Sequence, residues 1–555
     1  MKRTLSIVMF IGVALTCAAQ DTYLNTQITN QADVIGTARF VGMGGAMGAL
    51  GADISTISSN PAGIAMMKKT DVSITAGGVW QGQKCPYSFG YSPAHATVDQ
   101  AGFVSSFKTG NDDGLVNFNF GFNYQKKIDY NQAFGGATAT NASLIDVLNN
   151  SSVKSFQDGI FSPYQQVREG GQSVAVYNMA TFYGAYPTTR SDYATSGNCT
   201  AVSSSGFLAS YDFSLSANIS NRYFFGLTFG VDNVRFNQDV YYGEIGQYQC
   251  TDNNLEFVNH QEVRGHGFNL KLGGIVRPFE DNSFRIGLAI ETPTWYKLNY
   301  CDDQALYTNI VDDVNGTRYS HNLNGQTLYG HYVNDHNENY NANYLDYKLV
   351  TPWKFRVQAG GTIGTQLALG MEYEYAMYNW TTMKYPNGWY GSTSDAGIDD
   401  WTERMIKGQH SLRLGLEFKP IDKLALRAGY NAISSVYEDG AYWDNRASTN
   451  AIHYPTSFQY TNFGMTNIIT VGIGYRSKYF YADLAYKCRL QNGNHYAFNS
   501  MQQIDDTEWS QAYEDRYFQG IDYGMEDAAR QAGGMSAIPV SMTRHSIVAT
   551  LGVKF

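Results

Sequence analysis

The stretch HSIVATLGVKF, residues 545–555, ends the chain and decides its fold. Ile547, Ala549, Leu551, Val553 and Phe555 are apolar, and mostly polar or small residues lie between them. Successive side chains of a β-strand point to opposite faces, so this alternation predicts a strand with one apolar face and one mostly polar face. A tilted strand of about ten residues crosses a bilayer. A soluble sandwich has similar strands, so the remaining sequence has to separate the two folds.

The first residues, MKRTLSIVMFIGVALTCAAQ, predict a cleaved secretory signal. Lys2 and Arg3 precede an apolar run, and small residues follow it up to Ala19. We place the cleavage after Ala19, so that residues 1–19 form the signal peptide; acylation of Cys17 is the alternative, but the residues before it fit a lipidation site poorly. No later apolar run reaches the length of about 18 residues that a spanning helix needs. An exported chain that lies in a membrane is then a closed barrel.

The composition agrees with an exported β-protein. The 555 residues include 42 Tyr, 30 Phe and 56 Gly, a mixture that favours strands over helices. The net charge of -10 argues against a nucleic acid as partner. Four cysteines fall in predicted loops, Cys85, Cys199, Cys250 and Cys301, and they allow three disulfide pairings among which the sequence does not choose.

Alternating segments recur along the whole chain. NFNFGFNYQ, residues 117–125, places aromatic rings on one face and mainly Asn and Gln on the other. There are fourteen such segments, and they begin near residues 71, 101, 115, 205, 222, 262, 283, 345, 366, 408, 423, 466, 479 and 543. The fold class is therefore all-β, a 14-stranded antiparallel transmembrane β-barrel in which the last strand closes against the first.

The connections between these segments alternate in length. Short ones such as TGNDDG (109–114) and PIDK (420–423) carry turn residues. The long ones are residues 128–204, 237–261, 299–344, 382–407, 438–465 and 493–542. Short turns in the periplasm and long loops outside are typical of the outer membrane of a Gram-negative bacterium, and a soluble sandwich has no reason to keep this order. Residues 71–555 are thus predicted to form the barrel.

Residues 20–70 lack the alternation of strands and predict a compact, partly helical plug, or hatch, inside the lumen. Their glycine-rich stretch GMGGAMG (42–48) invites a dinucleotide fingerprint, but no strand leads into it and no βαβ unit follows. Asn60 is suited to cap a short helix, with Pro61 in its first turn.

This segment resembles the plug of the FadL family of outer-membrane transporters for long-chain fatty acids and other hydrophobic compounds. The family pattern is a glycine and small-residue stretch, an acidic residue and an Asn-Pro-Ala motif before fourteen strands. The matching residues are Gly42, Gly44, Gly45, Ala46, Asp53, Asn60, Pro61, Ala62 and Gly63. The resemblance implies that outer loops collect a hydrophobic ligand, which leaves sideways where the third strand kinks inward.

Two further residues take roles from this comparison. Gly121 lies at the centre of the third predicted strand, where glycine permits a bend towards the lateral exit, or only makes room for the plug. Phe555 resembles the terminal aromatic that outer-membrane proteins present to the barrel insertion machinery.

The charged residues predicted to face the lumen do not identify a ligand site. They are Lys271, Arg285, Arg356, Glu372, Glu374, Arg413, Glu417, Arg427, Asp483 and Lys487. Arg427 and Glu417 are expected to pair across a short turn, so no ligand arginine is assigned. His331, His336 and Glu338 lie close together in a predicted loop, but polar loop histidines usually bind neither metal nor haem, so no metal and no cofactor is expected.

The sequence thus predicts transport of hydrophobic small molecules such as long-chain fatty acids, captured outside and released laterally into the membrane. The alternative is a barrel that serves as scaffold for a surface adhesin, haem receptor or porin. An enzyme is not expected, because no Ser, His and acid constellation is recognisable. The expected partners are the ligand, outer-membrane lipid and lipopolysaccharide, and the insertion machinery; the chain is expected to be a monomer. Fatty acid, aromatic hydrocarbon and haem all remain open as ligands.

Overall fold

The fold is that of a computed structural model. It describes residues 19–30, 32–82, 94–111, 113–138, 165–169, 172–177, 194–247, 254–314, 317–322, 326–328, 343–384, 396–442, 459–498 and 537–555. Residues 1–18 lie outside this set, so the signal peptide stays a prediction. Among the described residues, no helix has the length and apolar character that crossing a bilayer requires.

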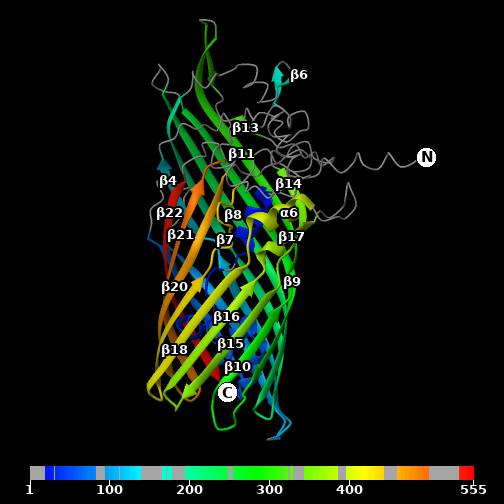
Figure 1. Ribbon diagram of the computed structural model, residues 1–555, viewed down its shortest axis with the longest axis vertical. Coiled ribbons are helices and arrows are strands. Elements are labelled where there is room, and N and C mark those ends of the chain that lie inside the picture. Colours follow the sequence, from blue (N-terminus) through cyan, green and yellow to red (C-terminus); the bar gives the residue numbers. More distant parts are fainter. Residues whose placement is uncertain are drawn as a thin grey trace, which may run out of the picture.

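Fourteen antiparallel strands close into a barrel (Figure 1), as predicted. They are β1 (Asp71–Gln81), β2 (Ala94–Lys108), β3 (Leu115–Asp129), β7 (Ala194–Ile219), β8 (Tyr223–Gln247), β9 (Asn254–Val276), β10 (Arg285–Glu291) with β11 (Trp295–Val314), β14 (Asn343–Val350) with β15 (Lys354–Ile363), β16 (Leu367–Ala376), β18 (Gln409–Ile421), β19 (Leu424–Ile433), β20 (Tyr460–Arg476), β21 (Phe480–Tyr496) and β22 (Ile538–Lys554). β22 pairs with β1, from Asp71 opposite Lys554 to Gln81 opposite Arg544. The last strand therefore closes on the first and leaves neither edge unpaired.

Shorter elements extend or decorate these strands. They are β4 (Gln132–Thr138), β5 (Gln165–Glu169), β6 (Gln172–Tyr177), β12 (Thr317–Asn322), β13 (Gln326–Leu328), β17 (Thr382–Lys384), η2 (Tyr378–Trp380) and α6 (Ala396–Met405). β4 pairs with β7 and β17 pairs with β14, so both prolong the wall on the side of the long connections.

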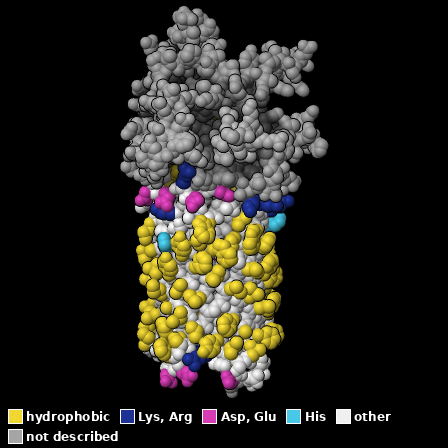
Figure 2. Space-filling model, turned by 45° about the vertical axis from the view of Figure 1, so that its right-hand side comes forward, with side chains coloured by type: hydrophobic (Ala, Val, Ile, Leu, Met, Phe, Trp, Pro, Cys, Tyr) yellow, Lys and Arg dark blue, Asp and Glu magenta, His cyan; other side chains and the backbone are white. Residues whose placement is uncertain are grey.

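The barrel wall turns its apolar side chains outwards. On β3, Phe118 and Phe120 are exposed while Asn117 and Asn119 are buried towards the lumen. The exposed apolar side chains form a belt around the barrel (Figure 2), with charged side chains at its two edges. An apolar belt on a closed barrel is the lipid-facing surface of an outer-membrane protein. The chain is therefore a multi-pass β-barrel of the outer membrane.

The N-terminal segment lies inside the barrel, where Figure 1 shows it in dark blue. It contains α1 (Ala19–Thr29), α2 (Ala38–Gly42), α3 (Thr56–Ser59) and the 3-10 helix η1 (Pro61–Met66). The predicted partly helical plug is thus present, and β1 begins at Asp71 directly after it.

The predicted loops were too long, because several strands continue far beyond the belt. β7 begins at Ala194, β8 ends at Gln247 and β11 ends at Val314, all within predicted loops. Cys199 and Cys301 accordingly lie in strands β7 and β11, which corrects their assignment to loops. Cys85 and Cys250 lie outside the described residues, so the predicted disulfide choice among the four stays open.

Candidate functional site

An apolar cluster fills the lumen around α1, on the side of the long connections. Leu24 and Ile28 of α1 are its centre. The wall residues of the cluster are Ile128, Tyr130, Leu208, Val234, Phe236, Val263, Tyr296, Leu298, Tyr300, Tyr347, Leu349 and Met383. We call this region the apolar compartment. Its wall members lie in β3, β7, β8, β9, β11, β14 and β17, apart from Tyr130, which directly follows β3. The barrel wall itself therefore supplies the apolar surface.

Tyrosines hold α1 in the compartment. Tyr130 donates its hydroxyl to the carbonyl of Ile28 at 2.6 Å, and Tyr378 donates to the carbonyl of Thr29 at 3.1 Å. The last carbonyls of a helix have no partner within the helix, so these two hydroxyls complete its C-terminus. Tyr23 stacks on Tyr437 with ring centroids 5.4 Å apart. α1 is therefore fixed by neutral contacts alone at these points.

Little empty space remains beside α1. A cavity of about 40 Å³ lies between Tyr23, Gln27 and wall residues that include Phe134 and Tyr460. Sites that take drug-sized ligands measure about 300–1,000 Å³. This cavity is therefore too small for a drug-sized ligand while α1 occupies the compartment.

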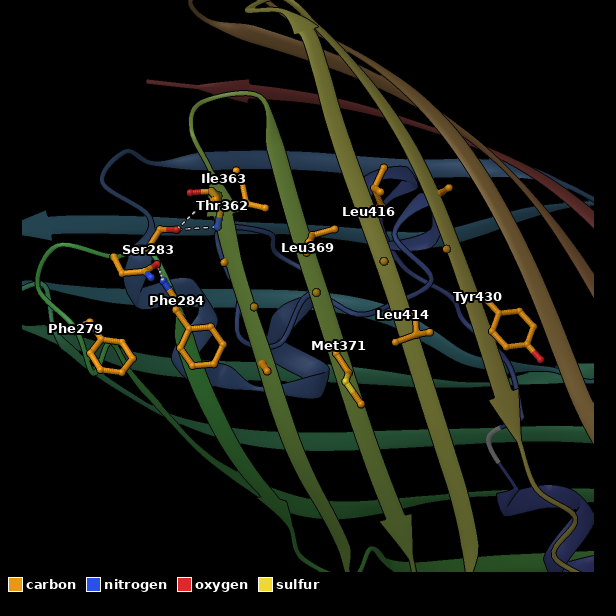
Figure 3. Close-up of a pocket in the computed structure, with 18 residues that line it drawn as sticks. Phe279, Ser283, Phe284, Thr362, Ile363, Leu369, Met371, Leu414, Leu416 and Tyr430 are labelled. Atoms are coloured by element: carbon orange, nitrogen blue, oxygen red, sulfur yellow. Dashed lines mark hydrogen bonds between the residues drawn. The ribbon is translucent and has the colours of Figure 1, made fainter.

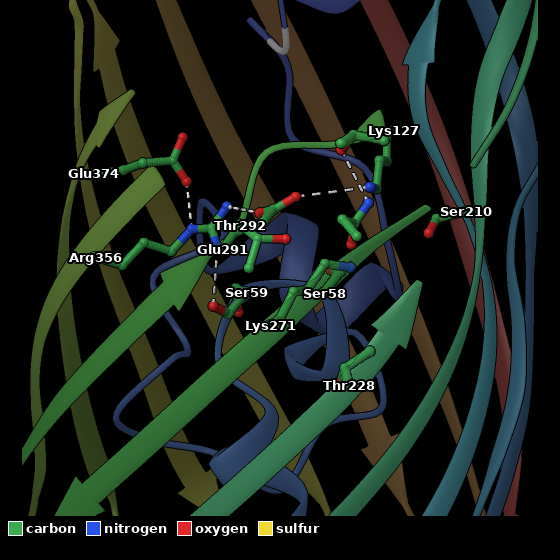
Figure 4. A network of polar contacts seen from close by, with 12 residues as sticks. Ser58, Ser59, Lys127, Ser210, Thr228, Lys271, Glu291, Thr292, Arg356 and Glu374 are labelled. Carbon is green, nitrogen blue, oxygen red and sulfur yellow. Dashed lines mark hydrogen bonds and ion pairs between the residues drawn. The ribbon is translucent and has the colours of Figure 1, made fainter. Parts of the chain in front are cut away.

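A chain of buried charges adjoins the compartment, and Figure 4 shows several of its members inside the barrel. Lys127 Nζ is 2.9 Å from Asp232 Oδ1, and it is 3.9 Å from Glu291 Oε1. Arg356 Nη2 is 2.7 Å from Glu291 Oε2, and its Nη1 donates to the carbonyl of Ser59 in the plug at 3.3 Å. The chain of charges thus links the wall to the plug.

Two neighbours extend this network. Arg356 also pairs with Glu374 on β16, and Lys271 Nζ is 2.9 Å from Asp212 Oδ1. Tyr296, a member of the apolar compartment, donates its hydroxyl to Asp232 Oδ2 at 2.7 Å. We call these buried charged residues the charged floor. It begins directly where the apolar compartment ends.

A second charge cluster anchors α2. Arg39 Nε is 3.0 Å from Glu417 Oε2, and Glu417 also accepts from Arg427 at 2.8 Å. Arg427 Nη1 continues to Asp483 Oδ1 at 2.6 Å. The predicted pair of Arg427 and Glu417 is confirmed. Arg39 and Arg427 are thus each paired with a carboxylate of the protein.

The first turn after α1 carries another such anchor. Lys487 Nζ lies 2.6 Å from Asp33 Oδ1. Burial raises the pKa of the Asp33 carboxyl, but Lys487, Arg489 and Arg544 lower it by more, so its pKa lies below the ordinary value. Asp33 is therefore a carboxylate in the closed barrel.

The plug is seated against a ring of wall glycines that face the lumen. A Cβ atom added at any of them would press on a plug atom, which only glycine avoids. They are Gly121, Gly226, Gly273, Gly360, Gly370, Gly415, Gly429 and Gly472. We call them the glycine ring. In three successive pairs of neighbouring strands, two of these glycines lie directly opposite each other: Gly360 and Gly370, Gly370 and Gly415, and Gly415 and Gly429.

Most residues of the predicted plug motif lie at this ring. Gly42 approaches Gly472, Gly44 approaches Gly429, and the carbonyl of Ala46 approaches Gly370. Pro61 and Ala62 pack on Gly226, and Asn60 reaches Gly273. Gly45 and Gly63 instead pack within the plug, against Phe40 and Thr56 respectively.

Two polar residues of the motif shape the plug itself. Asn60 caps η1 by accepting from the backbone N–H of Ala62 at 3.1 Å, and it donates to Gln358 Oε1 of the wall at 2.6 Å. Asp53 accepts from the Thr37 hydroxyl at 2.8 Å and from the Ser55 backbone N–H at 3.0 Å. Both side chains thus serve local structure, and one of them also ties the plug to the barrel.

Gly121 and Phe555 occupy positions of different kinds. A Cβ at Gly121 would lie 2.8 Å from Ile57 of the plug, and β3 pairs with both neighbouring strands without a shift of register from Asn117 to Gln125. A bend at Gly121 therefore stays a prediction.

Phe555 is 68% exposed, and its backbone N–H donates to the carbonyl of Thr70 at 3.1 Å, so its ring points outwards at the end of the closing strand.

The wall pairing is interrupted at one place beside the compartment. β10 and β15 stop pairing after Glu291 and Lys354, and β11 and β14 resume at Trp295 and Val350. We call residues 292–294 and 351–353 the seam. Pro293 and Pro352 lie within it, and proline has no N–H to donate to a ladder.

Threonines bridge the seam. Thr294 donates its backbone N–H to the Thr351 hydroxyl at 2.9 Å, and the Thr351 N–H donates to the carbonyl of Thr294 at 3.1 Å. Tyr296 and Leu349 of the apolar compartment lie immediately above, whereas Trp295 and Trp353 point towards the lipid. The seam thus lies between the compartment and the membrane.

A hollow of considerable volume lies on the outside of the barrel and not in the lumen. Its volume is about 760 Å³, and Leu369, Met371, Leu414 and Tyr430 project around it (Figure 3). Since these side chains belong to the lipid-facing belt, this hollow lies in the membrane and is no part of the lumen site.

Several contributors to the site carry no sequence signal. Tyr130, Tyr378 and Tyr437 were not distinguished from the other tyrosines, because their partners on α1 are more than 100 residues away in the chain. His331, His336 and Glu338 lie outside the described residues. Within the described ranges, no group of His, Cys, Asp and Glu is arranged to hold a metal ion.

Known proteins resemble the chain in structure but not closely in sequence. No protein-family model and no curated protein sequence matches it. Its structure is similar to that of a Pseudomonas aeruginosa FadL homologue, with 12% identity, 94% of this chain and 98% of that chain covered, and a TM-score of 0.46. The Pseudomonas putida toluene transporter TodX gives 11% identity, coverage of 94% and 99%, and a TM-score of 0.44. The monoaromatic hydrocarbon channel CymD gives 9% identity, coverage of 95% of this chain and 98% of that chain, and a TM-score of 0.46.

Proposed function

We propose that the chain transports hydrophobic small molecules, such as long-chain fatty acids, across the outer membrane. The apolar compartment is the observation that carries this proposal. A porin for polar solutes has a polar, water-filled interior. Here the wall around α1 presents buried aromatic and aliphatic side chains, which favour an apolar ligand by about 0.8 kcal/mol per buried methylene.

In this proposal α1 acts as the gate. The compartment is full while α1 lies in it, and the neutral contacts of Tyr23, Tyr130 and Tyr378 are the ones that a ligand replaces. Each such hydrogen bond contributes about 1 kcal/mol net. The ligand must also replace the burial of Leu24 and Ile28, about 1.5–3 kcal/mol each, so a long-chain ligand with many buried methylenes is the kind that can displace the helix.

The exit in this proposal is sideways. The plug and the charged floor block the way down, and an apolar chain would lose its burial by crossing them. The seam lies at the base of the compartment, and two prolines weaken the pairing there. Opening of the seam would release the ligand into the lipid beside Trp295 and Trp353. The third strand at Gly121 remains the other proposed exit.

Uptake of a fluorescent long-chain fatty acid by cells that carry the protein tests the gate. Tyr130→Phe combined with Tyr378→Phe removes both hydroxyls from the end of α1 and should increase the uptake rate. Exposed Tyr475→Phe with Tyr479→Phe is the matched control, because both rings lie on the outer surface. Uptake of a small sugar should not change in either variant. If fatty-acid uptake equals that of cells without the protein while the sugar enters, the porin alternative replaces this proposal.

A disulfide across the seam tests the exit. Thr294→Cys with Thr351→Cys should block uptake under oxidising conditions, and a reductant should restore it. Ile290→Cys with Phe355→Cys joins the same two strands below the seam, where they pair regularly, and should leave uptake unchanged. Undiminished uptake through the oxidised seam variant would exclude the seam and leave Gly121 as the proposed exit.

A further inference from the structure

A row of basic side chains crosses four neighbouring strands on the outside of the barrel. Lys297 of β11 lies opposite His266 of β9 on one side and opposite Lys348 of β14 on the other. Lys348 in turn lies opposite Lys384 of β17. All four side chains are exposed and point outwards. We call them the basic ladder.

Within the described part of the chain, the ladder has no ion-pair partner. Like charges directly opposite each other on adjacent strands destabilise a sheet. Among the described residues, no carboxylate lies within ion-pair distance of any ladder side chain. Two acidic side chains on the same strands have other partners: Glu262 pairs with Arg264, and Asp346 accepts a hydrogen bond from Asn299. A row of three lysines in register therefore calls for an anion from outside the chain.

The height of the ladder indicates where that anion comes from. Two residues below Lys297, Trp295 packs on Phe268 with ring centroids 5.2 Å apart, and both rings are exposed. Trp353 and Phe355, in and just below the seam, stack on each other and are exposed as well. Exposed aromatic rings of this kind mark the level of lipid headgroups at the membrane surface. In Figure 2, Lys and Arg side chains gather at the upper edge of the apolar belt, on the side opposite to the short turns.

We propose that the basic ladder binds the phosphate groups of a glycolipid in the outer leaflet, with the acyl chains lying down the apolar belt below it. Lysine ammonium groups bind phosphate as compact point charges. The belt under the ladder continues with Leu270, Leu288 and Val357, which are all exposed. One lipid molecule can therefore bind the lysines with its phosphate groups and contact these apolar side chains with its acyl chains. A soluble anion would make only the first of these contacts.

Titration of the purified full-length protein in detergent with bisphosphorylated lipid A tests this site. The triple variant Lys297→Gln, Lys348→Gln and Lys384→Gln keeps the aliphatic stems and removes three charges. It should bind lipid A on the order of 100-fold more weakly, since each lysine near an anionic lipid surface contributes about fivefold. The matched control triple, Lys108→Gln, Lys423→Gln and Lys478→Gln, removes three exposed lysines at the periplasmic edge and should bind as the unchanged protein does.

Three results would overturn the proposal. One is an equal loss of affinity in both triples, and another is unchanged affinity of the ladder triple for lipid A. The third is that dephosphorylated lipid A, inorganic pyrophosphate or oleate occupies the ladder as tightly as bisphosphorylated lipid A does. Heat-modifiable mobility on a gel shows whether each triple is a folded barrel, and Lys348→Gln alone, expected to weaken binding about fivefold, provides a milder second variant. Fatty-acid uptake plays no part in this readout, so its outcome is separate from that of the transport proposal.

Discussion

The two halves of the lumen hold the N-terminal segment by different means. In the apolar compartment, α1 rests on aromatic rings and a few neutral hydrogen bonds. In the lower half, the plug is fixed by buried ion pairs such as Arg39 with Glu417, and by backbone contact with the glycine ring. Neutral hydrogen bonds contribute about 1 kcal/mol each, whereas loss of one partner from a buried ion pair costs about 3–5 kcal/mol.

This difference separates a movable part from a fixed part within one short segment. A helix held by neutral contacts exchanges them for a hydrophobic ligand at small cost. A segment held by charges and by close backbone packing cannot leave without exposing unpaired carboxylates and guanidinium groups. The comparison therefore predicts that α1 moves while the rest of the plug stays.

Removal of the whole plug should have the largest effect. Deletion of residues 20–70 leaves all fourteen strands and Phe555, so the barrel should insert but conduct ions through its emptied lumen. Conductance in a planar bilayer is the measurement. Deletion of residues 20–30 alone, which removes α1, should leave the ion conductance close to that of the intact protein. A large conductance in the shorter deletion would show that the lower plug does not close the lumen by itself.

Loss of a buried charge should come next. Arg427→Met leaves Glu417 and Asp483 without this partner and should lower the free energy of unfolding by about 3–5 kcal/mol. Arg222→Met is the control, because its pair with Glu280 is largely exposed and such pairs contribute about 0–1 kcal/mol. Denaturant unfolding in detergent measures both. Equal stability of the two variants would remove the contrast between the halves.

Loss of the η1 cap should have a smaller effect. Asn60→Ala removes the bond to Ala62 and the bond to Gln358, and the cap contributes about 1 kcal/mol. We expect brief ion-current openings in a planar bilayer, without a steady pore. Asn111→Ala in an exposed periplasmic turn should show none. A steady pore in Asn60→Ala would mean that the cap, and not the glycine ring, holds the plug.

The pH dependence should be the weakest signal. Because the pKa of Asp33 is lowered in the folded state, its contribution to plug stability is present above the ordinary Asp pKa of about 3.9 and is lost as the pH falls through the lowered value. Proteolysis of the N-terminal segment should therefore rise only at strongly acidic pH. Asp33→Asn should show the raised proteolysis already at neutral pH, and a wild-type rise near pH 6 would contradict this assignment.

The sequence predicts the membrane-spanning wall well because one physical demand repeats in every strand. Lipid outside and a polar lumen inside produce the alternation in Phe118, Asn119 and Phe120 as clearly as in the final strand. Beyond the belt both faces meet polar surroundings, so β8 continues through NQDVYYGEIGQ (237–247) without a readable alternation. The predicted loops were too long for that reason.

The lumen site was predictable only in part. The plug motif stands out because glycine is required where two backbones touch, as at Gly44 and Gly429. The helix α1, with the sequence AQDTYLNTQIT, has no apolar stripe, since it is surrounded by the barrel on all sides. Its tyrosine partners and the pairing of Arg39 with Glu417 join residues far apart in the chain, and such contacts leave no local pattern.

The glycine ring also implies an order of assembly. At the glycine ring the plug lies so close to the wall that no wall side chain fits between them, so a finished barrel offers little clearance through which the segment could be threaded. The plug precedes β1 in the chain, and β1 forms the final junction with β22. The wall must therefore curl around a plug that is already in place, and the join between the first and last strands is the step that traps it.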